Sequence, residues 1–127
     1  YVKMKHQDLI DKIVPLPLEL KKVEELIFED NLRLLAVEKQ IAYWENNEMR
    51  KITDEVDKDN KFIYTNDLKR KSELETRKRD DVAIRGLSTK AEGLSSSIKT
   101  NEIQFKFLDR ELKVLHSIIK LVAGDVE

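Results

Sequence analysis

The sequence has no cysteine, only three glycines and two prolines, and 6% aromatic residues in 127 positions. Without cysteine the chain forms no disulfide, holds no thiolate-bound metal and has no thiol nucleophile. The scarcity of glycine and proline removes the usual helix breakers from most of the chain. A compact globular core would draw on more aromatic residues, so the composition favours long helices.

Other absences limit the expected partners and location. With 24 basic and 25 acidic residues the net charge is −1, so charge alone predicts no attraction to nucleic acid or an anionic membrane. No apolar run approaches the roughly 20 residues of a membrane span, and no signal segment is recognisable. A chain without cysteine fits the cytoplasm or another reducing intracellular compartment. Because it begins at Tyr1 and not at Met, we expect a trimmed or partial protein.

Helical periodicity is the strongest positive signal, and it is clearest between residues 84 and 122. Positions three and four residues apart form a row of twelve side chains, eleven of them apolar. Such a row lies along one stripe of a helix and predicts a coiled-coil seam. Its members are Ile84, Leu87, Ala91, Leu94, Ile98, Asn101, Phe105, Leu108, Leu112, Leu115, Ile119 and Val122. Asn101 is either a buried residue that fixes the register or a half-exposed boundary position.

A second long helix is predicted over residues 18–60, which contain neither Gly nor Pro. Its seam has the same spacing, with Asp30 as its polar member, and we expect Trp44 in the core. The members are Leu20, Val23, Ile27, Asp30, Leu34, Val37, Ile41 and Trp44. Pro15 and Pro17 separate this helix from a short amphipathic helix over residues 4–14.

Each long helix carries a further apolar row beside its seam. One row is Phe28, Leu35, Ala42, Met49 and Val56, with Leu32 nearby, and the other is Phe107, Val114, Ile118 and Leu121. One partner helix covers only one seam, so apolar faces this wide predict two partners. The second partner is either the short first helix or another copy of the hairpin in a dimer.

The fold predicted from these patterns is all-α, with residues 1–127 forming a single helical domain. Helices 18–60 and 82–123 form a long antiparallel coiled-coil hairpin. The short helix 4–14 completes a three-helix base, and residues 58–82 form a charged tip. A break is expected in the Asn- and Asp-rich residues 57–67, followed by helix again over 68–81.

Two pairing registers fit the hairpin. The first places Ile27 near Leu115 and Leu20 near Val122. The second has its turn nearer residue 64 and pairs the short first helix with the end of the last one. Gly86 and Gly93 are the expected sites of a kink or break, because each costs about 1 kcal/mol against Ala in a helix.

The sequence contains few residues and no motif suited to catalysis. His6 and His116 are the only histidines, and no carboxylate lies four residues from His116 to form a metal pair on a helix. No nucleophile elbow, phosphate loop or dinucleotide motif is present. The carboxylates alternate with lysines and arginines, as on solvated helix faces. We expect no enzyme, no cofactor and no metal site.

Two surfaces remain as candidates. Protein contact is predicted at Leu20, Ile27, Phe28, Leu35, Phe107, Val114, Ile118 and Leu121. Phosphate contact is predicted at Lys69, Arg70, Lys71, Arg77, Lys78 and Arg79, with Phe62 and Tyr64 available for base stacking. The favoured function is a non-enzymatic interaction, scaffold or adaptor module that binds another protein or a second copy of itself, and not a membrane. Nucleic-acid binding is the alternative.

Overall fold

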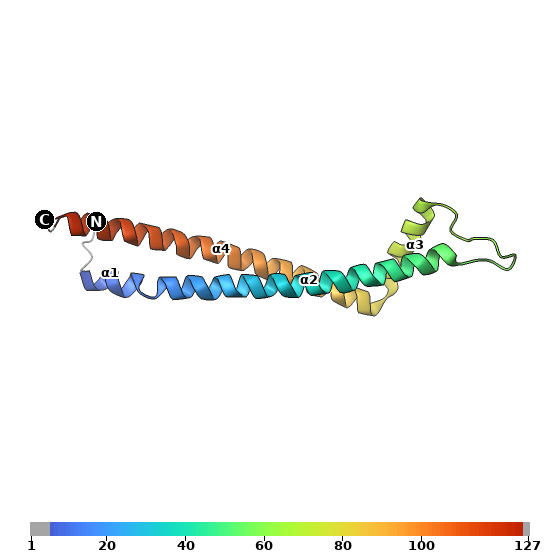
Figure 1. Ribbon diagram of the computed structural model, residues 1–127, viewed down its shortest axis with the longest axis horizontal. Helices are drawn as coiled ribbons and strands as arrows, with labels where there is room; N and C mark the ends of the chain where they lie inside the picture. The colour runs from blue at the N-terminus through green and yellow to red at the C-terminus, as the bar shows by residue number, and fades with distance from the viewer. Residues whose placement is uncertain (1–5, 126–127) are drawn as a thin grey trace. The chain divides into compact units, whose positions relative to one another are not determined.

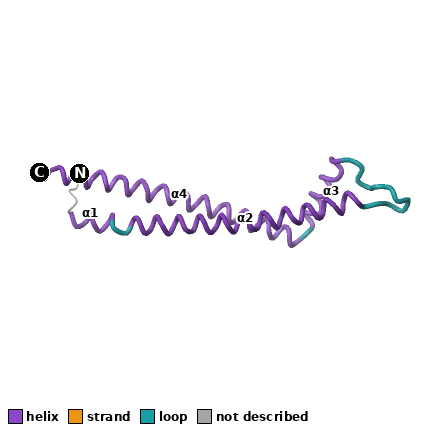
Figure 2. The backbone as a smooth tube through the Cα atoms, viewed as in Figure 1, coloured by secondary structure: helices purple, strands orange, loops and turns teal. Residues whose placement is uncertain are grey.

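The structure, a computed structural model, describes residues 6–125. Its helices are α1 (His6–Ile13), α2 (Leu16–Asp54), α3 (Asp67–Asp80) and α4 (Val82–Asp125). The described residues form no strand (Figure 2). The fold is therefore all-α, and α2 and α4 form the long helical hairpin that the seams predict. Residues 4 and 5 of the expected first helix lie outside the described range.

The chain divides into two compact units. The first unit consists of residues 1–31 and 96–127, and the second of residues 32–95. The first unit thus contains α1, the beginning of α2 and the C-terminal part of α4. The second contains the rest of α2, all of α3 and the start of α4.

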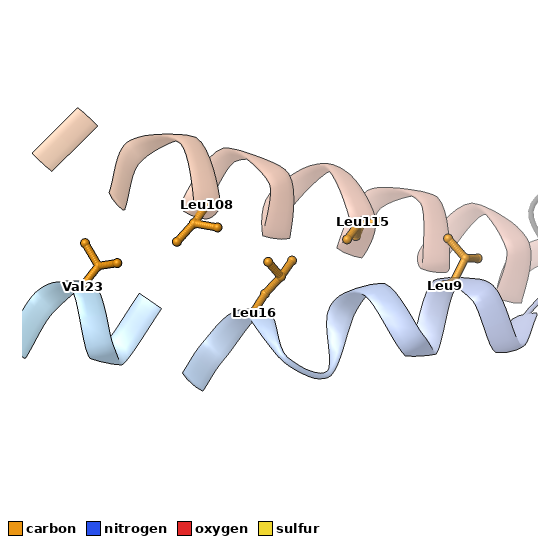
Figure 3. Close-up of a cluster of buried hydrophobic side chains, with 5 residues drawn as sticks. All are labelled: Leu9, Leu16, Val23, Leu108 and Leu115. Atoms are coloured by element: carbon orange, nitrogen blue, oxygen red, sulfur yellow. The ribbon is translucent and has the colours of Figure 1, made fainter. Parts of the chain in front are cut away.

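The core of the first unit is a single row of buried leucine and valine side chains. They come from α1 and α2 on one side and from α4 on the other, and they alternate along the seam (Figure 3). The five are Leu9, Leu16, Val23, Leu108 and Leu115, each at most 7% exposed. Burying such a side chain contributes about 1.5–3 kcal/mol, so this seam is the main source of stability in the unit.

Helix α1 continues the seam of α2 in phase. Leu9, Ile13, Leu16 and Leu20 keep the spacing of three and four residues through the proline-containing junction, and all four are buried or half-buried. Pro15 lacks an N–H, yet its carbonyl still accepts a hydrogen bond from the Glu19 N–H at 3.1 Å. The base therefore has three helical segments, as predicted, with α1 and α2 lying end to end along α4 (Figure 1).

The pairing register differs from the first of the two expected. Leu16, and not Ile27, lies next to Leu115 (Figure 3), and the Ser97 hydroxyl donates a hydrogen bond to the Asp30 carboxylate at 2.9 Å. These contacts centre the pairing near residue 64, so the second register is correct. A shift by whole heptads keeps apolar residues opposite one another, and the apolar pattern alone therefore does not choose between the registers.

In the second unit α2 ends at Asp54, earlier than the expected residue 60. The Asp57 carboxylate accepts hydrogen bonds from the N–H groups of Asp59 at 2.8 Å and Lys61 at 3.0 Å. Asn60 adopts a left-handed conformation with φ of 58°, which asparagine tolerates better than most residues. This local bonding competes with the helix and forms the turn.

Helix α3 begins at a side-chain cap and ends at its C-terminal cap Asp81, whose backbone N–H donates to the Arg77 carbonyl. The Asn66 side chain accepts a hydrogen bond from the Lys69 N–H at 2.9 Å and caps the first turn. The Asp81 backbone is extended after α3, and its carboxylate accepts from the Ile84 N–H at 2.9 Å to start α4. Helix α4 then runs unbroken through Gly86 and Gly93. The expected break at those glycines is therefore wrong, and the interruption lies at Asp81.

Candidate interaction surfaces

The predicted seams account for the buried surface of the long helices. All twelve members of the α4 row and all eight members of the α2 row are buried or half-buried. Asp30 is 7% exposed, which agrees with a buried polar residue that fixes the register. Asn101 and Trp44 are half-buried, so Asn101 is a boundary position of its seam.

The additional apolar rows remain exposed instead. Phe28 is 64% exposed on α2, and Phe107 and Leu121 are 66% and 70% exposed on α4. Because α1 follows the line of α2, it does not cover these rows. Of the eight predicted contact residues, Leu20, Ile27 and Ile118 pack partly against the core, whereas Phe28, Leu35, Phe107, Val114 and Leu121 are exposed.

The exposed row of α4 borders a shallow groove in the first unit. The groove lies between α1 and α4 and is lined by Lys12, Phe107, Arg110, Glu111, Val114 and Leu115. Lys12 therefore marks the side of α1 that lies beside the apolar row of α4. Phe28 lines a separate hollow on α2, among Lys21, Glu24, Glu25 and Glu29.

Charged residues flank these rows in regular order. On the side of α1 and α2 marked by Lys12, the spacing of three and four residues continues through Asp8, Lys12, Pro15, Glu19 and Lys22, all exposed. We call this set the charged row. On α4, Lys99, Lys106, Lys113 and Lys120 recur every seven residues and are all exposed. We call this second set the lysine row.

The contact between α2 and α3 in the second unit is ionic. The Arg77 guanidinium donates to carboxylates of Glu55 at 2.7 Å, Glu73 at 2.9 Å and Glu48 at 3.3 Å. The Lys78 amine lies 2.7 Å from a Glu45 carboxylate oxygen. Hydrogen bonds to Glu73 and then Glu55 raise the pKa of Arg77, and the hydrogen bond to Glu45 raises the pKa of Lys78. Both cations therefore stay charged and hold α3 against α2.

These ion pairs occupy part of the cluster expected to contact phosphate. Arg77 and Lys78 are engaged as described, and Arg70 donates to the Asp67 carboxylate at 3.0 Å and to the Tyr64 carbonyl at 3.3 Å. The other three predicted residues, Lys69, Lys71 and Arg79, are exposed. The cluster thus serves partly to attach α3 to α2.

The acidic partners were missed in the sequence, although a signal for them exists. Glu48 and Glu55 follow Ile41 at intervals of seven residues, so they continue the α2 seam beyond its apolar part. Glu73 and Arg77 lie four residues apart and extend the α4 seam backwards. A search for seam positions of opposite charge would have predicted that α3 packs on α2.

The remaining expectations from the sequence concern metal ions, the two histidines and membranes. Within the described part of the chain, no three His, Cys, Asp or Glu side chains are grouped so that they could hold a metal ion. His116 is exposed on α4, and the side chain of His6 lies outside the described set. None of the described helices combines the length and apolar character that crossing a bilayer requires.

Comparison with known proteins gives no further guidance, since no family model, no curated protein and no solved structure matches the chain. The surfaces are therefore interpreted from their own geometry and charge.

Proposed function

We propose that the protein is a non-enzymatic interaction module that binds another polypeptide through the apolar row of α4 in its first unit. The observation that carries the proposal is the exposure of Phe107, Val114 and Leu121, which recur every seven residues and are each more than half exposed. Single exposed apolar residues are common on folded proteins, whereas an ordered row is not.

The shape of the surface agrees with a helical partner. An amphipathic helix binds a groove through anchors spaced three, four and seven residues apart. Phe107 and Val114 border such a groove beside α1, and Arg110 and Glu111 supply charged groups at its edge. The large ring of Phe107 is the best candidate for the main anchor, because large aromatic side chains contribute much of the binding energy at interfaces.

Site-specific photo-crosslinking tests the proposal. A photoreactive amino acid replaces Phe107, and in a matched control it replaces the exposed Lys90 of the second unit. In an extract of the source cells we expect a distinct crosslinked species from position 107 and none from position 90. The variant Val114→Ser/Leu121→Ser should lower the yield of that species. Equal crosslinking at both positions would contradict a dedicated surface.

Nucleic-acid binding remains a prediction with weaker support. The exposed Lys69, Lys71 and Arg79 favour it, whereas the ion pairs of Arg77 and Lys78 reduce the charge available to phosphate. The test is a salt titration of DNA and RNA binding with the wild type and with Lys69→Glu/Lys71→Glu/Arg79→Glu. Binding that weakens steeply with salt and disappears in the triple variant would support it. No binding at about 50 mM salt, where phosphate contacts are strong, would exclude it.

A further inference from the structure

We propose that the partner of this surface is a second copy of the same chain, packed antiparallel through the face that carries both the charged row and the apolar row of α4. The proposal rests on the proposed function and names its partner. The observation that supports it is the order of the charges along α1 and α2. When a second copy runs in the opposite direction, each acidic residue of the charged row faces a basic residue of the other copy.

The charged row is antisymmetric about Pro15. Asp8 and Lys22 each lie seven residues from Pro15, and Lys12 and Glu19 lie three and four residues from it. A two-fold axis through Pro15, perpendicular to the helices, therefore places Asp8 opposite Lys22 of the second copy. It also places Lys12 opposite Glu19 of the second copy. Each pair occurs twice, so four contacts join unlike charges.

The four side chains are available for these contacts. All are exposed, and none takes part in an ion pair or hydrogen bond among the described residues. Charge pairs across an interface fix its register and suppress wrong partners, more than they add affinity. The apolar row of α4 has to supply the remaining energy.

The same axis brings apolar residues of α4 together. The contact between Asp30 and Ser97, with Leu16 between Leu108 and Leu115 (Figure 3), sets an antiparallel register in which residue 15 is about level with residues 112 and 113. Phe107 and Ile118 are equally far from that level, and each therefore faces the other in the second copy. Val114 lies beside the axis, opposite Glu111 of the second copy. The charge pairs of α1 and α2 and the apolar pair of Phe107 and Ile118 therefore form in one register.

Other arrangements of two copies are less favourable. The lysine row lies about 100° around α4 from the apolar row, and a two-fold axis there would place lysine opposite lysine. Like charges that meet across an interface are destabilising. A two-fold axis parallel to the helices would place the charged row on the apolar row and remove charges from water without partners. The antiparallel arrangement avoids the contact between lysines, leaves only Glu111 opposite an apolar residue of the second copy, and closes after two copies.

The test is a charge exchange between two variants of the full chain. Lys12→Glu/Lys22→Glu makes the charged row wholly acidic, and Asp8→Lys/Glu19→Lys makes it wholly basic. We expect the wild type to show twice the 14.9 kDa mass of one chain by sedimentation equilibrium. Each variant alone should have its dimer dissociation constant raised about tenfold or more. An equimolar mixture should form the heterodimer, detected by native mass spectrometry.

Two controls separate this interface from others. Lys106→Glu/Lys120→Glu reverses charges of the lysine row and should leave the dissociation constant unchanged. Circular dichroism of every variant checks that the helices are intact, which is expected because all the changed side chains are exposed.

A crosslinking experiment checks the geometry without charge changes. Because the chain has no cysteine, Val114→Cys introduces a single thiol beside the proposed axis. A short bismaleimide should join two copies at position 114 and should fail with Lys106→Cys in the lysine row. A wild type that stays monomeric at every concentration, or an acidic variant that dimerises like the wild type, would overturn the proposal. Crosslinking of a different protein at position 107 would then still support the proposed function.

Discussion

The apolar seam of the first unit and the contact between α2 and α3 in the second unit hold their helices together by different means. In the first unit the seam between α1, α2 and α4 is apolar, with Asp30 and Ser97 forming a part-buried polar contact. In the second unit α3 has no buried residue and is attached to α2 through Arg77 and Lys78. The α2 seam therefore carries apolar side chains along α4 and the carboxylate Glu48 along α3, while the second unit also buries Val37, Ile52 and Ile84.

The two kinds of contact differ in how much they stabilise the fold and in how strongly salt and pH affect them. Burial of apolar surface is little affected by salt and pH, whereas exposed ion pairs contribute at most about 1 kcal/mol each and are screened by salt. The side chain of Arg77 is 27% exposed, so its ion pairs belong to the weaker class. We expect α3 to be released under conditions that leave the first unit folded.

The largest effect is expected in the apolar seam. Leu115→Ala should lower the free energy of unfolding by about 3 kcal/mol, because Leu115 is 5% exposed and its truncation leaves a cavity beside Leu9 and Leu16. Urea unfolding followed by circular dichroism measures the change. Val82→Ala, at a position of α4 that is 73% exposed, serves as the control and should have little effect. Equal losses in both variants would refute the buried seam.

Substitution in the ionic contact should lower the free energy of unfolding less, and its effect should be confined to α3. Arg77→Met removes the cation from three carboxylates, and we expect a loss of about 1–2 kcal/mol, since Glu55 and Glu73 lose this partner and Glu48 keeps only Lys51 among the described residues. Hydrogen exchange should show a loss of protection in α3 and no loss in α1. In 1 M NaCl the difference between wild type and variant should shrink. A loss independent of salt would mean that packing, and not charge, holds α3.

The start of α3 is expected to depend on one cap. Asn66→Ala removes the acceptor of the Lys69 N–H and should cost about 1 kcal/mol, seen as faster exchange in the first turn of α3. Asn66→Asp keeps an acceptor and should restore the protection. If both variants exchange alike, the cap has no role in holding the helix.

Glycine in the long helix should allow a gain in stability. Gly93 lies inside α4, and a Cβ atom added there would meet nothing within 4 Å. Gly93→Ala should therefore raise the free energy of unfolding by about 0.5–1 kcal/mol through the better helix propensity of alanine. Thermal unfolding measures the shift. A lower melting temperature would show that the glycine is needed for a local distortion.

The smallest effect concerns alkaline pH. The hydrogen bond to Glu45 raises the pKa of Lys78, so the folded state favours its charged form. This contribution is fully present below the unfolded pKa of about 10.4 and is lost as pH rises through the folded pKa. Fluorescence of Trp44, which lines a groove with Arg77 and Glu48, should report loosening of α3 above that pH. Lys78→Met should remove this part of the pH dependence.

Much of the fold follows from spacing alone. Rows such as Leu108, Leu112 and Leu115 report directly which side of a helix is buried, because helical geometry puts them on one stripe. The register does not follow in the same way, since Leu16 and Ile27 present similar surfaces to Leu115. The contact between Asp30 and Ser97, together with the ion pairs of α3, distinguishes the two registers.

The candidate surfaces could be predicted in part. The exposed rows with Phe28 and Phe107 were recognised because a single seam does not cover them. The second register places α1 against the end of α4, where it lies, and the seam spacing of Leu9, Ile13 and Leu16 continues in line with α2. The roles of Arg77 and Lys78 depend on carboxylates distant in the sequence, which the local charge pattern does not reveal.

The junction at Pro15 and Pro17 should also determine which part of the α1, α2 and α4 packing unfolds first. Neither proline donates a backbone hydrogen bond to the residues before it. Fraying of α1 therefore interrupts few hydrogen bonds of α2, and we expect the two helices to unfold as separate segments. The residues before Pro15 should then be the earliest site of proteolytic cleavage, while the chain from Leu16 onward still holds its place against Leu108.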